Sequence, residues 1–329
     1  MPSFSPRTAR CLLSFCLSVV AIATTIGCNQ SSPNAKLGDG SEATASADGK
    51  LNVVCTTSQV ADIARRVGGE RVQVTAIMGP GVDPHLHKAS PRDIDAFNGA
   101  DIIFYSGLHL EGRLADLLVE MADDRPTIAV TQVLRKQHSD KLREPEEFEG
   151  HYDPHVWFDP TIWVHCVQLV GEELGKLDAE NANAYTAAAK DYQAEILATH
   201  EKWKQQLASI PESQRVLVTA HDAFGYFGNA YGIEVRGLQG ISTADETDLT
   251  TVGNLVDLLV SRKIKAVFVE SSVASRNVQS LVENCQNKGH TLVVGGELFS
   301  DAMGSEGTSE GTYIGMMNHN VRTIVEALK

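Results

Sequence analysis

The alternation of strand-like and helix-like segments constrains this fold more than any other feature of the sequence. Short apolar runs bounded by turn residues are typical of buried strands; they occur at residues 51–55, 72–78, 102–105, 128–130, 216–219, 233–237, 266–269 and 291–294. Helical patterns lie between and after them, near residues 91–98, 111–121, 161–177, 247–261, 277–288 and 313–328. Strands that alternate with helices predict an α/β fold with mostly parallel sheets.

One long helical pattern divides this series into two halves. Its apolar positions recur at helical spacing, at Tyr185, Ala189, Tyr192, Ile196, Trp203 and Leu207. About 28 residues at 1.5 Å each make a rod of about 42 Å. We therefore expect an N-terminal lobe over residues 51–180 and a C-terminal lobe over residues 211–329, each with its own core. A rigid helix over residues 181–210 would join them beside a ligand cleft, with His200 on its solvent side.

The first 50 residues have the composition of an export signal and a tether. A basic start precedes an apolar run that is shorter than the ~20 residues a membrane span requires. The run ends at Gly27-Cys28 in a pattern that resembles a bacterial lipobox, with Thr25 where an aliphatic residue is usual. The sequence predicts a signal peptide over residues 1–27, lipidation of Cys28 and a polar tether over residues 28–50. The globular part would then lie outside the cytoplasm, anchored to a membrane.

Charge and cysteine content argue against a nucleic-acid-binding protein, a disulfide-stabilised protein and a thiolate metal site. The chain has 28 Lys and Arg against 42 Asp and Glu, a net charge of −14, whereas a nucleic-acid-binding protein needs a basic surface. Apart from Cys11, Cys16 and Cys28, only Cys55, Cys166 and Cys285 remain. An odd number of cysteines without a CxxC pair argues against both a disulfide framework and a thiolate metal site.

Four side chains stand out by their context. His85 and His155 each end an Asp-Pro-His tripeptide, in GVDPHLH and GHYDPHVWFDP, and proline restricts the backbone before the imidazole. His221 directly follows the strand VLVT, and Asp301 follows the strand TLVV and a glycine turn. Ligands bind beyond the carboxyl ends of parallel strands, so these side chains, two from each half, are predicted to face one cleft. Three imidazoles and a carboxylate suit zinc or another first-row divalent metal.

Most of the 11 histidines are expected to have no role in metal binding. For a histidine without such context, a surface position or a hydrogen-bonded core position is the better interpretation. This applies to His109, His138, His165, His290 and His319.

Several longer segments resemble a known family. In chain order they are VDPHLH, GADIIFYSGLHLEG, YDPHVWFDP, TAHDAFGYFGNAYGIEV, GLQGIST, FVESSV and GGELFSDAMG. Together they resemble the substrate-binding lipoproteins of zinc and manganese ABC importers, the cluster that includes ZnuA, PsaA and TroA, and most of all its TroA-type members. The resemblance runs from about residue 51 to the C-terminus. It implies two α/β lobes joined by a single rigid helix.

The resemblance also implies a site and a function. His85, His155, His221 and Asp301 fall on the family's ligand positions, whereas His87 does not. His221 stands where zinc-type and TroA-type members carry histidine and many manganese-type members carry glutamate. Segment 137–151 is short and acidic where zinc-dedicated members often have a long His-rich loop, so we interpret it as a solvated loop. The chain would act as a monomer that captures zinc or manganese and delivers it to a membrane permease.

Two other functions stay open from the sequence. A zinc hydrolase would use the same ligand types, but it needs an open coordination position and a general base. Glu111 and Glu270 are candidates for that base, although the chain has no HExxH or GxSxG motif. A surface adhesin would also suit an exposed lipoprotein, and no residue pattern favours it.

Overall fold

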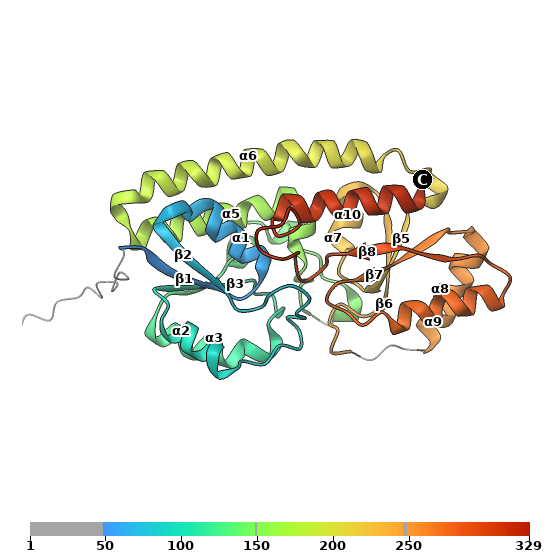
Figure 1. Cartoon of the computed structure of the whole chain (residues 1–329), viewed down its shortest axis with the longest axis horizontal. Coiled ribbons are helices and arrows are strands. Elements are labelled where there is room, and N and C mark those ends of the chain that lie inside the picture. Colours follow the sequence, from blue (N-terminus) through green and yellow to red (C-terminus); the bar gives the residue numbers. More distant parts are fainter. Residues whose placement is uncertain (1–48, 149, 246–248) are drawn as a thin grey trace, which may run out of the picture. The chain divides into compact units, whose positions relative to one another are not determined.

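The computed structural model describes residues 49–148, 150–245 and 249–329. The predicted signal peptide, Cys28 and nearly all of the predicted tether lie outside these residues. All described residues belong to the second of the two units into which the chain divides, residues 43–329. Within that unit, two α/β lobes lie side by side and one long helix runs along both (Figure 1). Among the described residues, no helix combines the length and the apolar character needed to cross a membrane.

The N-terminal lobe is built on a parallel sheet with strand order β2-β1-β3-β4. Its strands are β1 (Leu51–Cys55), β2 (Val72–Ala76), β3 (Ile102–Tyr105) and β4 (Thr127–Ala129). Helices α1 (Ser58–Gly68) and α5 (Pro160–Leu177) lie on one face of the sheet and α2 (Pro91–Asn98) and α3 (Ala115–Asp124) on the other, as Figure 1 shows; α4 (Gln132–Gln137) follows β4. Alternate side chains enter two cores, because Val53 packs toward α1 and α5 while Val54 packs toward α2 and α3.

The C-terminal lobe holds two parallel strand pairs, β5-β6 and β7-β8, with β5 packed beside β7. The strands are β5 (Val216–His221), β6 (Glu234–Gln239), β7 (Ala266–Glu270) and β8 (Val293–Leu298). The helices are α7 (Gly225–Tyr231), α8 (Leu249–Arg262), α9 (Arg276–Asn287) and α10 (Tyr313–Leu328). Sequence analysis therefore predicted the α/β class and the parallel pairing correctly.

The glycine pair before Asp301 is not a turn after the strand, as the sequence suggested, but part of β8. Gly296 has φ +151°, beside a register shift between β7 and β8. A Cβ atom on Gly295 would lie 2.6 Å from Ala327 Cβ, and one on Gly296 would lie 2.5 Å from Thr323 Cγ2. The glycines therefore allow an irregular strand to lie close against α10, and they extend the strand to within three residues of Asp301.

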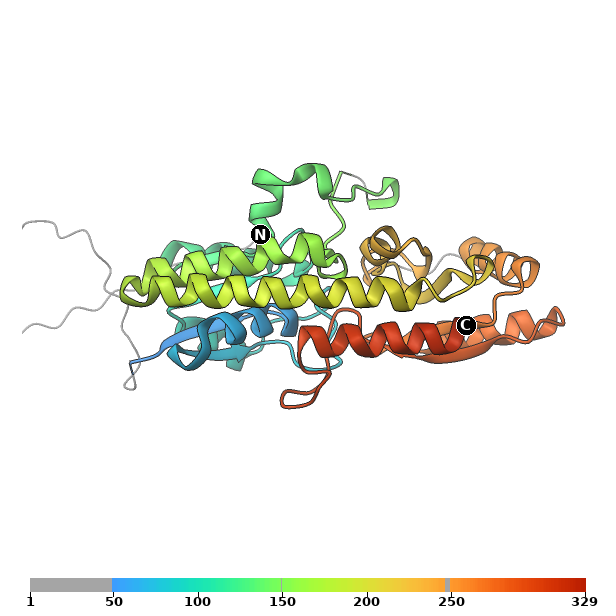
Figure 2. The same cartoon turned by 90° about the horizontal axis from the view of Figure 1, so that it is seen from above.

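The long connector is α6 (Ala182–Leu207), which packs on α1, α5 and α10 (Figure 2). All six apolar residues of the predicted stripe are buried on it. His200 is buried as well, contrary to expectation, and its Nδ1 lies 3.0 Å from the Tyr231 hydroxyl. It lies four residues after Ile196, and so continues the buried stripe.

The expectation of a separate core for each lobe holds for the outer layers only. One cluster of buried apolar residues extends from β1, α1 and α5 through α6 to α10 and the inner faces of β5 and β7. Only the outer layers have cores of their own, under α2 and α3 in one lobe and under α8 and α9 in the other. The two lobes are therefore joined by this shared interior as well as by α6. A close-packed interior resists deformation.

Candidate metal centre

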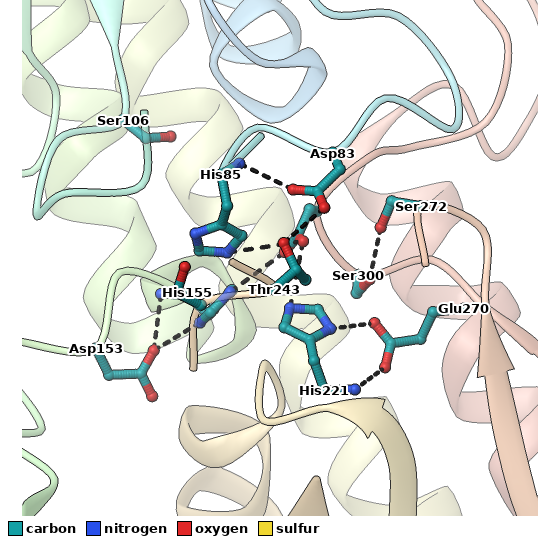
Figure 3. Close-up of polar contacts among 12 residues, drawn as sticks. Asp83, His85, Ser106, Asp153, His155, His221, Thr243, Glu270, Ser272 and Ser300 are labelled. Carbon is teal, nitrogen blue, oxygen red and sulfur yellow. Dashed lines mark hydrogen bonds and ion pairs between the residues drawn. The ribbon is translucent and has the colours of Figure 1, made fainter. Parts of the chain in front are cut away.

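The four predicted ligands come from four separate segments and meet at one place. His85 lies in the loop between β2 and α2, His155 precedes α5, His221 ends β5, and Asp301 follows β8. One ligand atom from each lies within 4.8 Å of the others. Figure 3 shows the imidazole rings of His85, His155 and His221 turned toward one another. The structure thus brings the four side chains together, two from each half of the chain.

The Asp301 carboxylate faces all three rings. Its Oδ2 lies 3.2 Å from His221 Nε2 and 3.9 Å from His85 Nε2, and its Oδ1 lies 3.3 Å from His155 Nε2. Zinc binds nitrogen and oxygen at about 2.0–2.2 Å, so ligand atoms around a tetrahedral ion stand about 3.3 Å apart. The separations at His221 and His155 match that spacing, and the one at His85 is longer.

The facing atoms are buried and form no hydrogen bonds with described residues. Each of the four residues is at most 4% exposed. Within the described residues, the Nε2 atoms of the three histidines and both carboxylate oxygens of Asp301 make no hydrogen bond of proper geometry. Buried polar atoms are normally paired. A single divalent cation among them would bind one atom from each of the four side chains.

The two Asp-Pro-His tripeptides form the same local turn. The His85 N–H donates to Asp83 Oδ1 at 2.9 Å, and the His155 N–H donates to Asp153 Oδ1 at 3.0 Å. An aspartate that accepts a bond from the backbone two residues later forms an Asx-turn. The aspartate therefore shapes the loop together with the proline, and both place the imidazole.

Carboxylates behind two of the rings orient them. His155 Nδ1 lies 2.8 Å from Asp153 Oδ1, and His221 Nδ1 lies 2.6 Å from Glu270 Oε2. Glu270 Oε1 also accepts a bond from the His221 N–H at 2.9 Å. A carboxylate at Nδ1 directs Nε2 toward a metal and raises its basicity.

Sequence reasoning gave neither carboxylate this role. Asp153 was visible as part of its motif. Glu270 was considered only as a catalytic base, and its place at the end of β7, beside β5, was the available signal.

Asp153 has a positive partner of its own. Arg143 Nη1 donates to Asp153 Oδ2 at 2.5 Å, and the Arg143 N–H donates to the Tyr226 hydroxyl at 3.0 Å. That hydroxyl donates to the Asp153 carbonyl at 3.1 Å. A Cβ atom on Gly225 would lie 1.1 Å from Arg143 Nη1, so only glycine at that position of α7 leaves room for the guanidinium. The loop that carries His155 is therefore held against the C-terminal lobe.

Asp83 makes a different contact across the lobes. Its Oδ2 accepts a bond from Thr243 Oγ1, in the loop after β6, at 2.6 Å (Figure 3). Asp83 and Thr243 line a cleft of about 860 Å³ between the His85 loop and the loops that follow β6 and β7. The hydrogen bond thus ties the two sides of this cleft together, next to His85.

The surroundings shift the pKa values of the four groups in different directions. Burial lowers the pKa of His85 to about 3. Burial alone would lower the pKa of His155 too, but the carboxylates of Asp153 and Asp301 raise it to about 9. The carboxylates of Glu270 and Asp301 likewise overcome burial and hold the pKa of His221 well above its ordinary value. Burial would raise the pKa of Asp301, but the imidazoles of His221 and His155 hold it well below its usual range.

The remaining histidines with described contacts lie elsewhere. His87 Nε2 pairs with Asp93 Oδ2 at 3.1 Å, so it stands apart from the cluster as expected. Others bond to carbonyl oxygens or contact another histidine ring: His290, His319, the pair His109 and His151, and the pair His138 and His165. The cysteines of the described ranges, Cys55, Cys166 and Cys285, are free and buried.

Comparison with known proteins gives consistent matches. The family described as "Zinc-uptake complex component A periplasmic" (ZnuA) matches residues 53–327. The manganese-binding lipoprotein MntA of Bacillus subtilis is 48% identical over 285 residues, covering 86% of this chain and 92% of the relative. The zinc-binding protein TroA of Treponema pallidum is 43% identical over 284 residues, covering 86% and 91%.

A solved structure agrees with these sequence matches. The structure of the periplasmic zinc-binding protein TroA from Treponema pallidum matches with a TM-score of 0.81 at 42% identity, covering 85% of this chain and 99% of the other. The match extends over both lobes and the helix between them. The length of the family match and the identity to these relatives show that this chain belongs to the ZnuA family of periplasmic zinc-uptake components.

Proposed function

We propose that this protein is the extracytoplasmic substrate-binding component of an ABC importer for divalent metal, with His85, His155, His221 and Asp301 as ligands. The observation that carries the proposal is the set of buried, unpartnered imidazole and carboxylate atoms within 4.8 Å of one another. A cation is the partner that such a set lacks. Membership of a family of uptake components supports transport as the use of the site.

The transported metal follows from the ligand set. Imidazole nitrogen suits zinc and carboxylate oxygen suits manganese, and zinc stands above manganese in the divalent affinity series. Three imidazoles and one carboxylate therefore favour tighter zinc binding, with manganese also accepted. Relatives named for each metal, TroA and MntA, are similar to this chain over most of its length. Replacing His221 by glutamate should shift preference toward manganese, and competition between the two metals at fixed pH measures that shift.

A hydrolase would place different demands on this site. It would need an open coordination position and a base beside it. Glu270 hydrogen-bonds His221 from behind, and Glu111 accepts bonds from Thr56 Oγ1 and the N–H groups of Ser106 and Gly107. Both carboxylates are occupied in fixing structure, so binding and transport remain the function that the site supports best.

The rest of the chain serves delivery under this proposal. Residues 1–27 are a signal peptide, Cys28 carries the lipid, and residues 28–50 tether a monomer to the membrane. Lobes over residues 51–180 and 211–329, joined by a connector over residues 181–210, then present the metal to the permease. Cys28→Ser should release the protein into the soluble extracytoplasmic fraction; a variant that stays on membranes after a high-salt wash would overturn the anchor.

Elemental analysis tests the central claim. The purified protein should retain close to one zinc or manganese per chain, and a single-site variant at any of the four ligand positions should lose most of it. The His87→Ala variant is the matched control, since His87 lies near His85 but pairs with Asp93. Full metal content in two or more of the four ligand variants would refute the assignment.

A further inference from the structure

The segment that carries Asp301 belongs by sequence to the C-terminal lobe, since it connects β8 to α10. Residues 300–303 form neither helix nor strand, and all of them are buried. Their backbone groups therefore need partners outside regular secondary structure. The position of those partners decides which lobe holds Asp301 in place.

Two partners come from the first turn of α1, in the N-terminal lobe. Gln59 Nε2 donates to the Ser300 carbonyl at 3.1 Å, and the Met303 N–H donates to Ser58 Oγ at 2.9 Å. These bonds hold the chain one residue before and two residues after Asp301. An ion pair between Arg65 and Glu306 at 3.0 Å continues the contact at the surface, where such a pair adds little.

Gln59 is well suited to fix this loop. Its side chain is on a helix and the residue is completely buried, and a buried amide left without partners is costly. Its Oε1 lies 3.2 Å from Ser58 Oγ, so the two side chains also restrain each other. A ligand is placed accurately when the groups that support it are themselves locked.

Hydrogen bonds from α10 and from the loop after β7 hold the two residues before Asp301. The Phe299 N–H donates to Asn320 Oδ1 at 2.9 Å, and Ser300 Oγ lies 3.1 Å from Ser272 Oγ (Figure 3). These bonds secure the end of β8. The two bonds to α1, by contrast, lie on both sides of the ligand.

We propose that Ser58 and Gln59 are positioning residues for Asp301 and make this ligand a mechanical part of the N-terminal lobe. The inference rests on the proposed function. The four ligands then divide three to one: His85, His155 and Asp301 are carried by or bonded to the N-terminal lobe, and His221 lies at the end of β5 with Glu270 behind it on β7. The bonds from Thr243 to Asp83 and from Tyr226 to Asp153 cross between these two groups and must break when His221 leaves. Separation of the lobes withdraws His221 first and leaves a three-ligand half-site, instead of dividing the ligands in pairs.

The rate of zinc loss tests this division. Zinc-loaded protein is mixed with excess chelator, and dissociation is followed by stopped flow. Loss of a group that orients a ligand typically costs about 10–100-fold in metal affinity, so Gln59→Ala should raise the dissociation rate at least about tenfold. Ser58→Ala should act in the same direction, and Ser58→Thr, which keeps the hydroxyl, should restore a rate near that of the wild type. Ser272→Ala, which removes the hydroxyl contact from the other lobe, is the matched control and should have a smaller effect than Gln59→Ala.

A double-mutant cycle shows whether Gln59 acts through Asp301. In an Asp301→Asn background the further effect of Gln59→Ala should largely vanish, because residues that act as a unit are not additive. An unchanged rate in Gln59→Ala, or a full effect that persists in the Asp301→Asn background, would overturn the inference. Zinc binding that survives Asp301→Asn intact would instead overturn the ligand assignment itself. If thermal unfolding shows that Gln59→Ala does not fold, the Ser58→Ala and Ser58→Thr pair decides.

Discussion

The two Asp-Pro-His turns have the same sequence and the same backbone bond, yet their aspartates do different work. Asp153 turns its carboxylate back to the ring of its own histidine, at 2.8 Å from His155 Nδ1, and pairs with Arg143. Asp83 instead reaches the other lobe and accepts a bond from Thr243 at 2.6 Å. Asp153 therefore alters the basicity of its own histidine, whereas Asp83 links the two lobes beside its own histidine.

The difference also appears in the electrostatics of the two rings. Two carboxylates raise the pKa of His155 to about 9, whereas burial lowers the pKa of His85 to about 3. Without metal, these shifts favour a protonated imidazole in the second turn and a neutral imidazole in the first. The repeated motif thus sets the position of each imidazole, while neighbouring groups set its pKa.

Removing either ring should have the largest effect, because both turns supply a ligand. His85→Ala and His155→Ala should each weaken zinc binding by more than the roughly 10–100-fold that loss of a supporting group costs. Calorimetric titration measures both, with His87→Ala as a control that should bind normally. A near-normal affinity in either turn variant would show that its turn is not part of the site.

Changing the aspartates should separate the two turns. Asp153→Asn removes the charge behind His155 and leaves Arg143 unpaired, so zinc affinity should fall by about 10–100-fold. Asp83→Asn keeps an oxygen that can accept from the His85 N–H and does not alter the ring of His85, so its effect should be clearly smaller. Equal losses in the two variants would mean that the turns are equivalent after all.

The sequence predicted the α/β fold and the proximity of the four candidate ligands, because both follow from the positions of strand ends and from motifs within the chain. The supporting contacts were not predictable in the same way. Gln59 and Ser300 are 241 positions apart, and Thr243 and Asp83 are 160 apart; no local pattern joins such residues. The core shared by both lobes was not predicted for the same reason. Periodicity shows which face of α6 is apolar, but it does not show that one interior extends across both lobes.

Proton release on zinc binding should reveal the difference in pKa between the two rings. A ring with a raised pKa stays protonated until the pH rises through that pKa, so zinc must displace protons from His155 and His221 near pH 7 but none from His85. Zinc affinity should therefore fall as pH falls from 7.5 to 5, by about tenfold per pH unit for each proton released. Calorimetry in buffers of different ionisation enthalpy counts the protons. An affinity that is flat over this range would contradict a three-histidine site.

The number of protons released per zinc should change when the aspartate of one turn is replaced, but not when that of the other turn is replaced. Asp153→Asn removes a carboxylate that raises the pKa of His155, so this variant should release fewer protons per zinc than wild type at pH 7. Asp83→Asn should release the same number as wild type. An unchanged count in Asp153→Asn would show that Asp153 does not set the protonation of His155.

The smallest effect should come from the hydrogen bond between the lobes. Thr243→Val removes the donor to Asp83 and keeps the size and shape of the side chain. A single hydrogen bond contributes about 0.5–1.5 kcal/mol net, or roughly 2–10-fold, and this one ties the closed arrangement together without touching a ring. Zinc should therefore dissociate severalfold faster while its proton release stays unchanged, and Thr243→Ser should behave as wild type because it keeps the hydroxyl. If Thr243→Val loses zinc no faster than wild type, Asp83 holds only its own turn, and the two Asp-Pro-His copies differ in the tuning of the ring alone.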